Sequence, residues 1–155
     1  MLCKAVLFYH PGPTIRGDVA LSRSCHRVIP WPKHHDGKIY IPYEVSSGFY
    51  AHDKEAITKA VQEFEKKTHI RFHPRGNERD FVHIQALDGN WSFLGRQGGD
   101  QALSLEPGKV TKGTVLHELM HALGFHHEHC RSDRDQHVWV LSDNVKEGAT
   151  TFALL

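Results

Sequence analysis

Apolar side chains recur with two distinct periods along the chain, and these periods predict its elements. Residues 53–67 carry apolar side chains at helical spacing, so we predict an amphipathic helix that Asp53 caps; the positions are Ile57, Ala60, Val61 and Phe64. Short or alternating apolar runs predict strands at residues 38–45, 70–73, 81–85, 91–94 and 102–105. Pro42 interrupts the first run, which predicts an edge strand or a bulge, because proline donates no hydrogen bond to a ladder.

A second helix is predicted around residues 115–123, with an apolar arc on one side that would be buried in a core. Gly124 follows the last apolar residue and is a natural stop, since glycine takes the left-handed C-cap conformation without steric cost. Further on, residues 137–141 are typical of a short strand or turn, and Asp143 or Asn144 is expected to start a small helix. The order of helix, several strands and helix indicates an α+β fold, a twisted mixed sheet with its helices on one side.

The composition is that of one ordinary globular domain. Of the 155 residues, 39% are hydrophobic and 24% are charged, which leaves enough apolar side chains for a core. The formal net charge of +1 provides no broad basic field, so a nucleic acid partner is not expected, and no apolar run reaches the length of a membrane span. The three cysteines are Cys3, Cys25 and Cys130, and an odd number cannot pair completely within one chain.

Candidate chemistry is concentrated in the second predicted helix and the turn after it. His117 and His121 are four residues apart, about 40° around a helix axis, so both imidazoles can reach one small cation. A chain that turns at Gly124 can bring His127 to the same cation, and three imidazoles with a fourth position open are typical of hydrolytic zinc. Glu118 is placed to act as general base on the metal-activated water, which predicts peptide bond hydrolysis without a covalent intermediate.

The alternative interpretation of the same stretch is structural. In a chain with 14 histidines, an amphipathic core helix followed by a solvated histidine-rich turn could acquire incidental metal affinity. Glu118 and Gly124 would then be coincidences, whereas H-E-x-x-H-x-x-G-x-x-H fixes five positions that a zinc peptidase requires.

The full run HELMHALGFHHEHCRSDRD, residues 117–135, resembles the signature of the astacin family of metzincin zinc endopeptidases at every fixed position. Two further stretches, KTHIRFHPR at 67–75 and GRQGGDQALSL at 95–105, are similar to the same family. The resemblance implies a metzincin-like upper subdomain with a backing helix and a zinc-binding active-site helix. It also implies one Zn²⁺ ion, a protein or peptide substrate and secretion, and within the family the chain looks most like the hatching-enzyme subgroup.

The resemblance extends to roles for residues outside the motif. Residues 15–18, I-R-G-D, are similar to the propeptide motif in which an aspartate ligates the zinc, so Asp18 is expected to be a propeptide switch; a plain Gly-Asp turn is the alternative. Residues 1–23 would then be a propeptide remnant and residues 24–155 the peptidase domain. Trp91, Ser92 and Phe93 correspond to the edge strand along which the family binds substrate, with core packing of Trp91 as the alternative.

The chain also departs from the family pattern. Asn90 and Lys109 stand where the resemblance implies the two cysteines of one disulfide, and His69 stands at a cysteine of another. The methionine-containing turn and the tyrosine expected after the motif have no counterpart, because the methionines are Met1 and Met120 and every tyrosine precedes residue 51. We therefore expect a peptidase domain whose C-terminal part is missing. The alternative function is a truncated, catalytically weak zinc-binding or interaction module.

Overall fold

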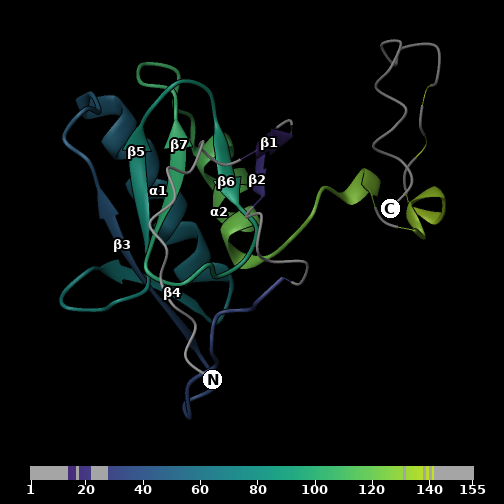
Figure 1. Cartoon of the computed structure of the whole chain (residues 1–155), viewed down its shortest axis with the longest axis horizontal. Coiled ribbons are helices and arrows are strands. Elements are labelled where there is room, and N and C mark those ends of the chain that lie inside the picture. The colour runs from purple at the N-terminus through teal and green to yellow at the C-terminus, as the bar shows by residue number, and fades with distance from the viewer. Residues whose placement is uncertain are drawn as a thin grey trace, which may run out of the picture.

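The computed structural model describes residues 14–16, 18–21, 28–130, 132–137, 139 and 141. Within these residues, seven strands form one mixed sheet in the order β1-β2-β6-β7-β5-β3-β4 (Figure 1). The strands are β1 (Thr14–Arg16), β2 (Val19–Leu21), β3 (Ile39–Val45), β4 (Ile70–Pro74), β5 (Phe81–Ala86), β6 (Trp91–Phe93) and β7 (Asp100–Leu105). The helices are α1 (Ala51–Lys67) and α2 (Lys112–Leu123), followed by the short 3₁₀ turns η1 (Glu128–Cys130) and η2 (Arg134–Gln136). The predicted α+β class is confirmed.

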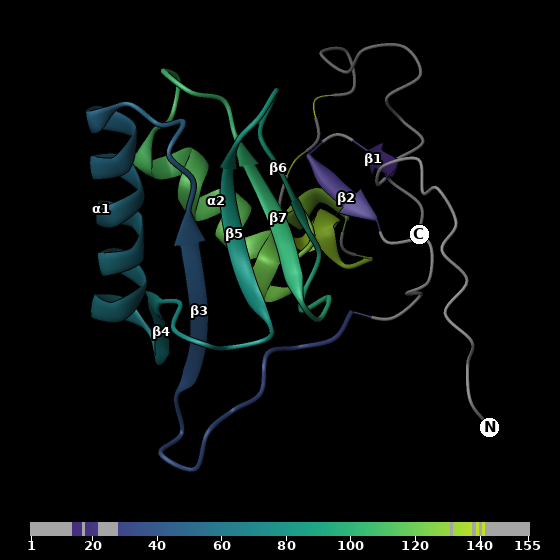
Figure 2. The ribbon, with the colours of Figure 1, turned by 60° about the vertical axis from the view of Figure 1, so that its left-hand side comes forward.

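Both α-helices lie on the same face of the sheet, as the two ribbon views show (Figures 1 and 2). Alternate residues of the central strands point toward them, including Ile41, Ile84 and Leu103, none of which has exposed surface. Ile57 and Phe64 of α1 and Val115 and Leu119 of α2 complete this core. Because burying one such side chain stabilises a protein by about 1.5–3 kcal/mol, the apolar arc of α2 fixes this helix firmly against the sheet.

Helix α1 begins at Ala51, so Asp53 lies in its first turn and is not the residue before it. The carboxylate of Asp53 still serves the helix end, because Tyr50 N–H donates to its Oδ2 at 3.2 Å. Gly108 N–H donates to the same oxygen at 2.9 Å. Asp53 therefore joins the start of α1 to the loop that leads into α2.

The prediction that Pro42 marks an edge strand is wrong for β3 as a whole, because β3 lies between β5 and β4. The register explains how proline is accommodated there. Strand β3 pairs with β4 over Ile39–Tyr43 but with β5 only from Tyr43 onward. Pro42 therefore lies where the strand has one paired neighbour, and locally it meets the requirement that the sequence indicated.

The N-terminal segment joins the sheet beside β6. Strands β1 and β2 pair antiparallel, and β2 runs parallel to β6 with Val19 opposite Ser92 and Ala20 opposite Phe93. This pairing brings Asp18, in the turn before β2, close to α2. At the other end, His137 lies in a turn, and the predicted helix start at residues 143–144 falls outside the described residues. None of the described helices is long and apolar enough to cross a membrane.

Candidate metal centre

Gly124, which the sequence analysis identified, ends α2, and Thr111, which it did not identify, caps the start of the helix. Thr111 precedes the helix, and its hydroxyl accepts a hydrogen bond from Thr114 N–H at 3.1 Å, which caps the first turn. Gly124 ends the helix with φ 105°, a left-handed conformation that favours glycine. An added Cβ at Gly124 would lie 2.8 Å from Val28 Cγ1, so glycine is required here for space as well as for backbone angle.

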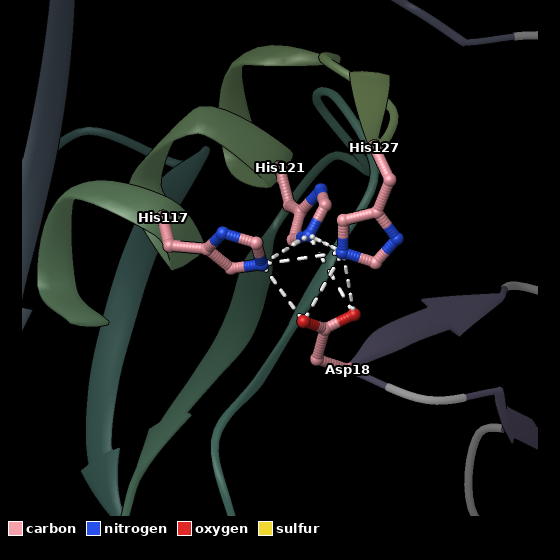
Figure 3. A group of neighbouring side chains, drawn as sticks. All are labelled: Asp18, His117, His121 and His127. Atoms are coloured by element: carbon pink, nitrogen blue, oxygen red, sulfur yellow. Dashed lines mark hydrogen bonds and ion pairs between the residues drawn. The ribbon is translucent and has the colours of Figure 1, made fainter. Parts of the chain in front are cut away.

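Three histidines converge at this end of the helix. His117 and His121 come from α2, and the turn at Gly124 carries His127 back to them (Figure 3). The His121 Nε2 atom lies 3.1 Å from Nε2 of both His117 and His127, and the third Nε2–Nε2 distance is 3.2 Å. The structure thus brings together the three nitrogens that the motif predicted.

This triangle of nitrogens suits one zinc ion. Tetrahedral ligands at zinc–nitrogen distances of 2.0–2.1 Å lie about 3.3 Å apart, close to the separations of the three Nε2 atoms. His121 Nδ1 lies 2.7 Å from the Phe125 carbonyl, and because a carbonyl only accepts, Nδ1 carries the hydrogen and Nε2 keeps its lone pair. Burial lowers the pKa of His121, although the Phe125 hydrogen bond opposes this, so the ring is held in the neutral form that binds metal.

Glu118 lies next to the histidines and is almost completely buried, with 1% of its surface exposed. Its Oε2 atom has no hydrogen-bond partner among the described residues. Burial, and to a lesser extent the charge of Asp18, raises the pKa of Glu118 to about 8. A cation bound at the histidines would oppose this shift, because a nearby positive charge favours the carboxylate. An orphaned carboxylate oxygen beside three convergent imidazoles is the arrangement expected where a metal and a water belong.

Asp18 faces the same three nitrogens from the other side (Figure 3). Its Oδ2 lies 2.7 Å from His117 Nε2, and its Oδ1 lies 3.0 Å from His127 Nε2 and 3.7 Å from His121 Nε2. Burial raises the pKa of Asp18, but the His117 hydrogen bond and the nearby imidazoles of His127 and His121 outweigh it, so the net pKa is lowered. The carboxylate therefore stands as a fourth group around the candidate metal position.

An open cavity of about 450 Å³ adjoins the site and is lined by Asp18, Asn90, Gly113, Thr114, His117 and Glu118. The predicted substrate residues of β6 do not line it. Ser92 is fully buried and its N–H donates to the Asp18 carbonyl at 2.9 Å, while Trp91 and Phe93 are half-buried and meet edge to face at 6.2 Å. Their strand is therefore connected to the metal site through the backbone of Asp18.

Three contacts at the site were not found from the sequence. The Phe125 carbonyl orients His121, and the buried Trp31 indole N–H donates to the Ala122 carbonyl at 2.9 Å, which anchors the last turn of α2. Asn90 Oδ1 accepts from Glu106 N–H at 3.0 Å. The family resemblance implies a disulfide between positions 90 and 109. The hydrogen bond from Glu106 to Asn90 joins the same two segments of this chain, which has no cysteine at either position.

Comparison with known proteins agrees with this geometry. The family model described as Astacin, a peptidase family, matches residues 30–153. The low choriolytic enzyme of Oryzias latipes is 43% identical over 116 residues, which cover 74% of this chain and 43% of that enzyme. The astacin-like metalloendopeptidase of Gallus gallus is 42% identical over 124 residues, which cover 79% of this chain and 29% of that protein. The chain thus spans less than half the length of these relatives.

A solved structure extends the likeness to three dimensions. High choriolytic enzyme 1, a hatching enzyme zinc-protease from Oryzias latipes, superimposes with a TM-score of 0.72 at 40% identity, over 81% of this chain and 63% of that chain. Astacin zinc metalloproteases use one zinc ion, and the cluster of His117, His121 and His127 is compatible with binding it. The chain belongs to the astacin family of peptidases.

Proposed function

We propose that the protein is a zinc-dependent endopeptidase in which His117, His121 and His127 hold the metal and Glu118 is the general base. The observation that carries this proposal is the convergence of three Nε2 atoms within 3.2 Å beside a buried glutamate with an unpartnered oxygen. A bound zinc ion would supply a positive charge that acidifies water and polarises the scissile carbonyl. The residues of the chain then have to position the water and the peptide and to move one proton from the water to the leaving amine.

Glu118 performs the proton transfer in this proposal. Its carboxylate accepts a proton from the attacking water as the water oxygen bonds to the carbonyl carbon. The same carboxyl group then delivers this proton to the amine nitrogen as the carbon–nitrogen bond breaks. Burial and a bound zinc ion would act on Glu118 in opposite directions. Burial raises its pKa to about 8, and the nearby cation would lower it, which favours a carboxylate that accepts a proton and, once protonated, returns it.

We also propose that the described conformation is latent and that Asp18 is the blocking group. A carboxylate within 3.7 Å of all three nitrogens is placed to occupy the coordination position that water needs. Strand β2 takes the free edge of β6, the edge to which an extended peptide would otherwise add through Trp91, Ser92 and Phe93. Residues 1–23 would then act as a propeptide for the peptidase domain at 24–155, and secretion follows from the family resemblance.

The first test is Glu118→Gln in the metal-loaded protein, made together with Asp18→Ala so that the proposed block is absent from the variant and from its Asp18→Ala reference. Zinc content should stay at one ion per chain, while hydrolysis of an unstructured protein substrate should fall by at least about 100-fold, the usual contribution of a general base. Zinc content is measured by elemental analysis and hydrolysis by the appearance of new amino groups, with a chelator-treated sample as the blank.

Glu55→Gln is the matched control, because Glu55 is an exposed glutamate on α1 far from the metal centre in sequence. It should retain both zinc and activity. Loss of zinc from Glu118→Gln would make Glu118 a structural residue. Full zinc occupancy without hydrolysis in the Asp18→Ala chain would favour the alternative of a zinc-binding or interaction module.

A further inference from the structure

A second group of metal-ligating side chains adjoins the histidine triad. His127, His129 and Cys130 each offer one ligand atom, and these atoms all lie within 4.8 Å of one another. His129 and Cys130 belong to η1, which begins directly after His127, and Cys130 N–H donates to the His127 carbonyl at 3.0 Å. This tight turn gathers two imidazoles and a thiol on one short segment, and His127 belongs to both groups.

We propose that His127, His129 and Cys130 form a second position for zinc or a similar borderline-soft cation, beside the zinc centre and sharing His127 with it. Two imidazoles and a thiolate are a ligand set that selects such ions over magnesium or calcium. The Nε2 atom of His127 points into the triad, and Figure 3 shows its other ring nitrogen pointing away from the other three side chains. That second nitrogen, Nδ1, is the atom left for the second cation.

Binding requires rings of the described arrangement to turn. The rings of His127 and His129 are stacked, 5.2 Å apart and inclined by 14°, whereas a ligated cation lies in the plane of each ring that binds it. His129 is exposed, so its ring can turn without disturbing the core, while His127 and Cys130 are only half-buried and within reach of ions from solvent. Binding releases the Cys130 thiol proton and the His127 Nδ1 proton to water, and water supplies the remaining ligand.

The shared histidine couples the two positions. A cation that replaces the Nδ1 proton of His127 places a second positive charge across the ring from the zinc centre, and repulsion between the two like charges lowers the affinity of the zinc centre for its metal. Excess zinc should therefore inhibit the enzyme, and this consequence alone rests on the proposed peptidase function. The existence of the second position does not, so the two can be tested separately.

Cobalt titration of the metal-free full chain tests the position directly. Co²⁺ bound by histidines alone shows only weak visible absorption, whereas a thiolate ligand adds a strong sulfur-to-metal charge-transfer band in the near ultraviolet. We expect the unsubstituted chain to bind two Co²⁺ ions and to develop this band. Cys130→Ser should bind one ion and show no band, and His129→Gln should weaken the second site by at least about 100-fold.

Two further variants make the outcome decisive. His117→Ala removes one ligand of the triad but leaves all three ligands of the second group, so the band should persist. His35→Gln is the matched control for an exposed histidine outside both groups and should leave both sites intact. Absence of the band from the unsubstituted chain, or two bound ions in Cys130→Ser, would overturn the proposal. Either result leaves the triad and its zinc unaffected.

Discussion

At the scale of single residues, the carboxylate of Asp18 contacts all three histidines of the site. One carboxylate reaches three imidazole nitrogens that come from α2 and from the turn after it. Anionic oxygen beside metal-binding nitrogens is stable when a cation lies between them, and it excludes other ligands from that place. The strength of this block therefore depends on the metal, and it should be measured with the metal bound.

Asp18→Ala should open the zinc to small inhibitors that bind through a hydroxamate group. The carboxylate would no longer compete for the fourth position, so inhibitor affinity should rise by at least about tenfold, which is about 1.4 kcal/mol. Calorimetric titration of the zinc-loaded protein measures this directly. Asp88→Ala, an exposed aspartate on the turn before β6, is the control. Equal inhibitor affinity in the two variants would contradict the switch.

Residue spacing predicted that three histidines would converge but not the contacts that orient them. Four-residue spacing places His117 and His121 on one helix face in any α-helix, so this part of the site follows from local geometry. The orientation of the His121 ring depends on the Phe125 carbonyl, which is available only because the chain turns left-handed at Gly124. A backbone group of this kind has no signature in the sequence.

At the scale of elements, α2 packs tightly against the core along its length, and its C-terminal end requires a glycine. Its apolar arc enters the core, while Gly124 must satisfy a positive φ and pass within contact of Val28. These two requirements set the direction in which the chain leaves the helix, and that direction decides whether His127 reaches the other two histidines. The geometry of the metal site is therefore sensitive to a residue that binds nothing.

Gly124→Ala should destabilise the protein, by about 1–2 kcal/mol for the left-handed conformation and more for the contact with Val28. Gly113→Ala is the matched control, because Gly113 lies in the first turns of the same helix and an added Cβ meets nothing closer than 3.8 Å. It should be neutral or stabilising by up to about 1 kcal/mol. Urea unfolding of both variants gives the comparison, and an equal loss in the two would refute the role of Gly124.

The bounds of an element could be predicted from the sequence where its apolar residues follow a clear period. Which strands pair with one another could not be predicted in this way. The periods of α1 and β5 locate these elements to within two residues of their observed bounds. Strand β2 has only three residues, too few for a period, and its parallel pairing with β6 joins segments more than 70 residues apart. Likewise, Pro42 correctly indicated a missing ladder bond but not the interior place of β3, which the neighbouring strands decide.

At the scale of the whole molecule, Asp80 holds together parts of the chain that are distant in sequence. It precedes β5, accepts a hydrogen bond from Gly99 N–H at 2.7 Å just before β7, and pairs with Arg96. The backbone N–H of Arg96 in turn donates to the Ile29 carbonyl at 2.7 Å. These contacts therefore link Asp80 to the segment at residues 28–29, which packs beside Gly124. The Gly99 hydrogen bond, aided by Arg96, lowers the pKa of Asp80 despite its partial burial.

This shift predicts how stability depends on pH. A carboxyl whose folded pKa lies below its unfolded value of 3.8 stabilises the fold fully above that value, and the contribution is lost as pH falls through the folded pKa. Asp80→Asn should cost about 1–2 kcal/mol at pH 7, and the difference from the unsubstituted chain should shrink below pH 3.8. Urea unfolding at both pH values measures this. Asp88→Asn should show no such convergence, and a pH-independent difference for Asp80→Asn would refute the linkage.

The bond from Trp31 to Ala122 has a consequence for maturation. Asp18, the proposed blocking group, and Trp31, which secures the last turn of α2, lie on either side of residues 22–27. A single cut within that interval would discard the first and keep the second. Under the proposed switch, activation would then leave the helix that carries the three histidines in place, because the blocking residue and the anchoring residue lie on opposite sides of the cut.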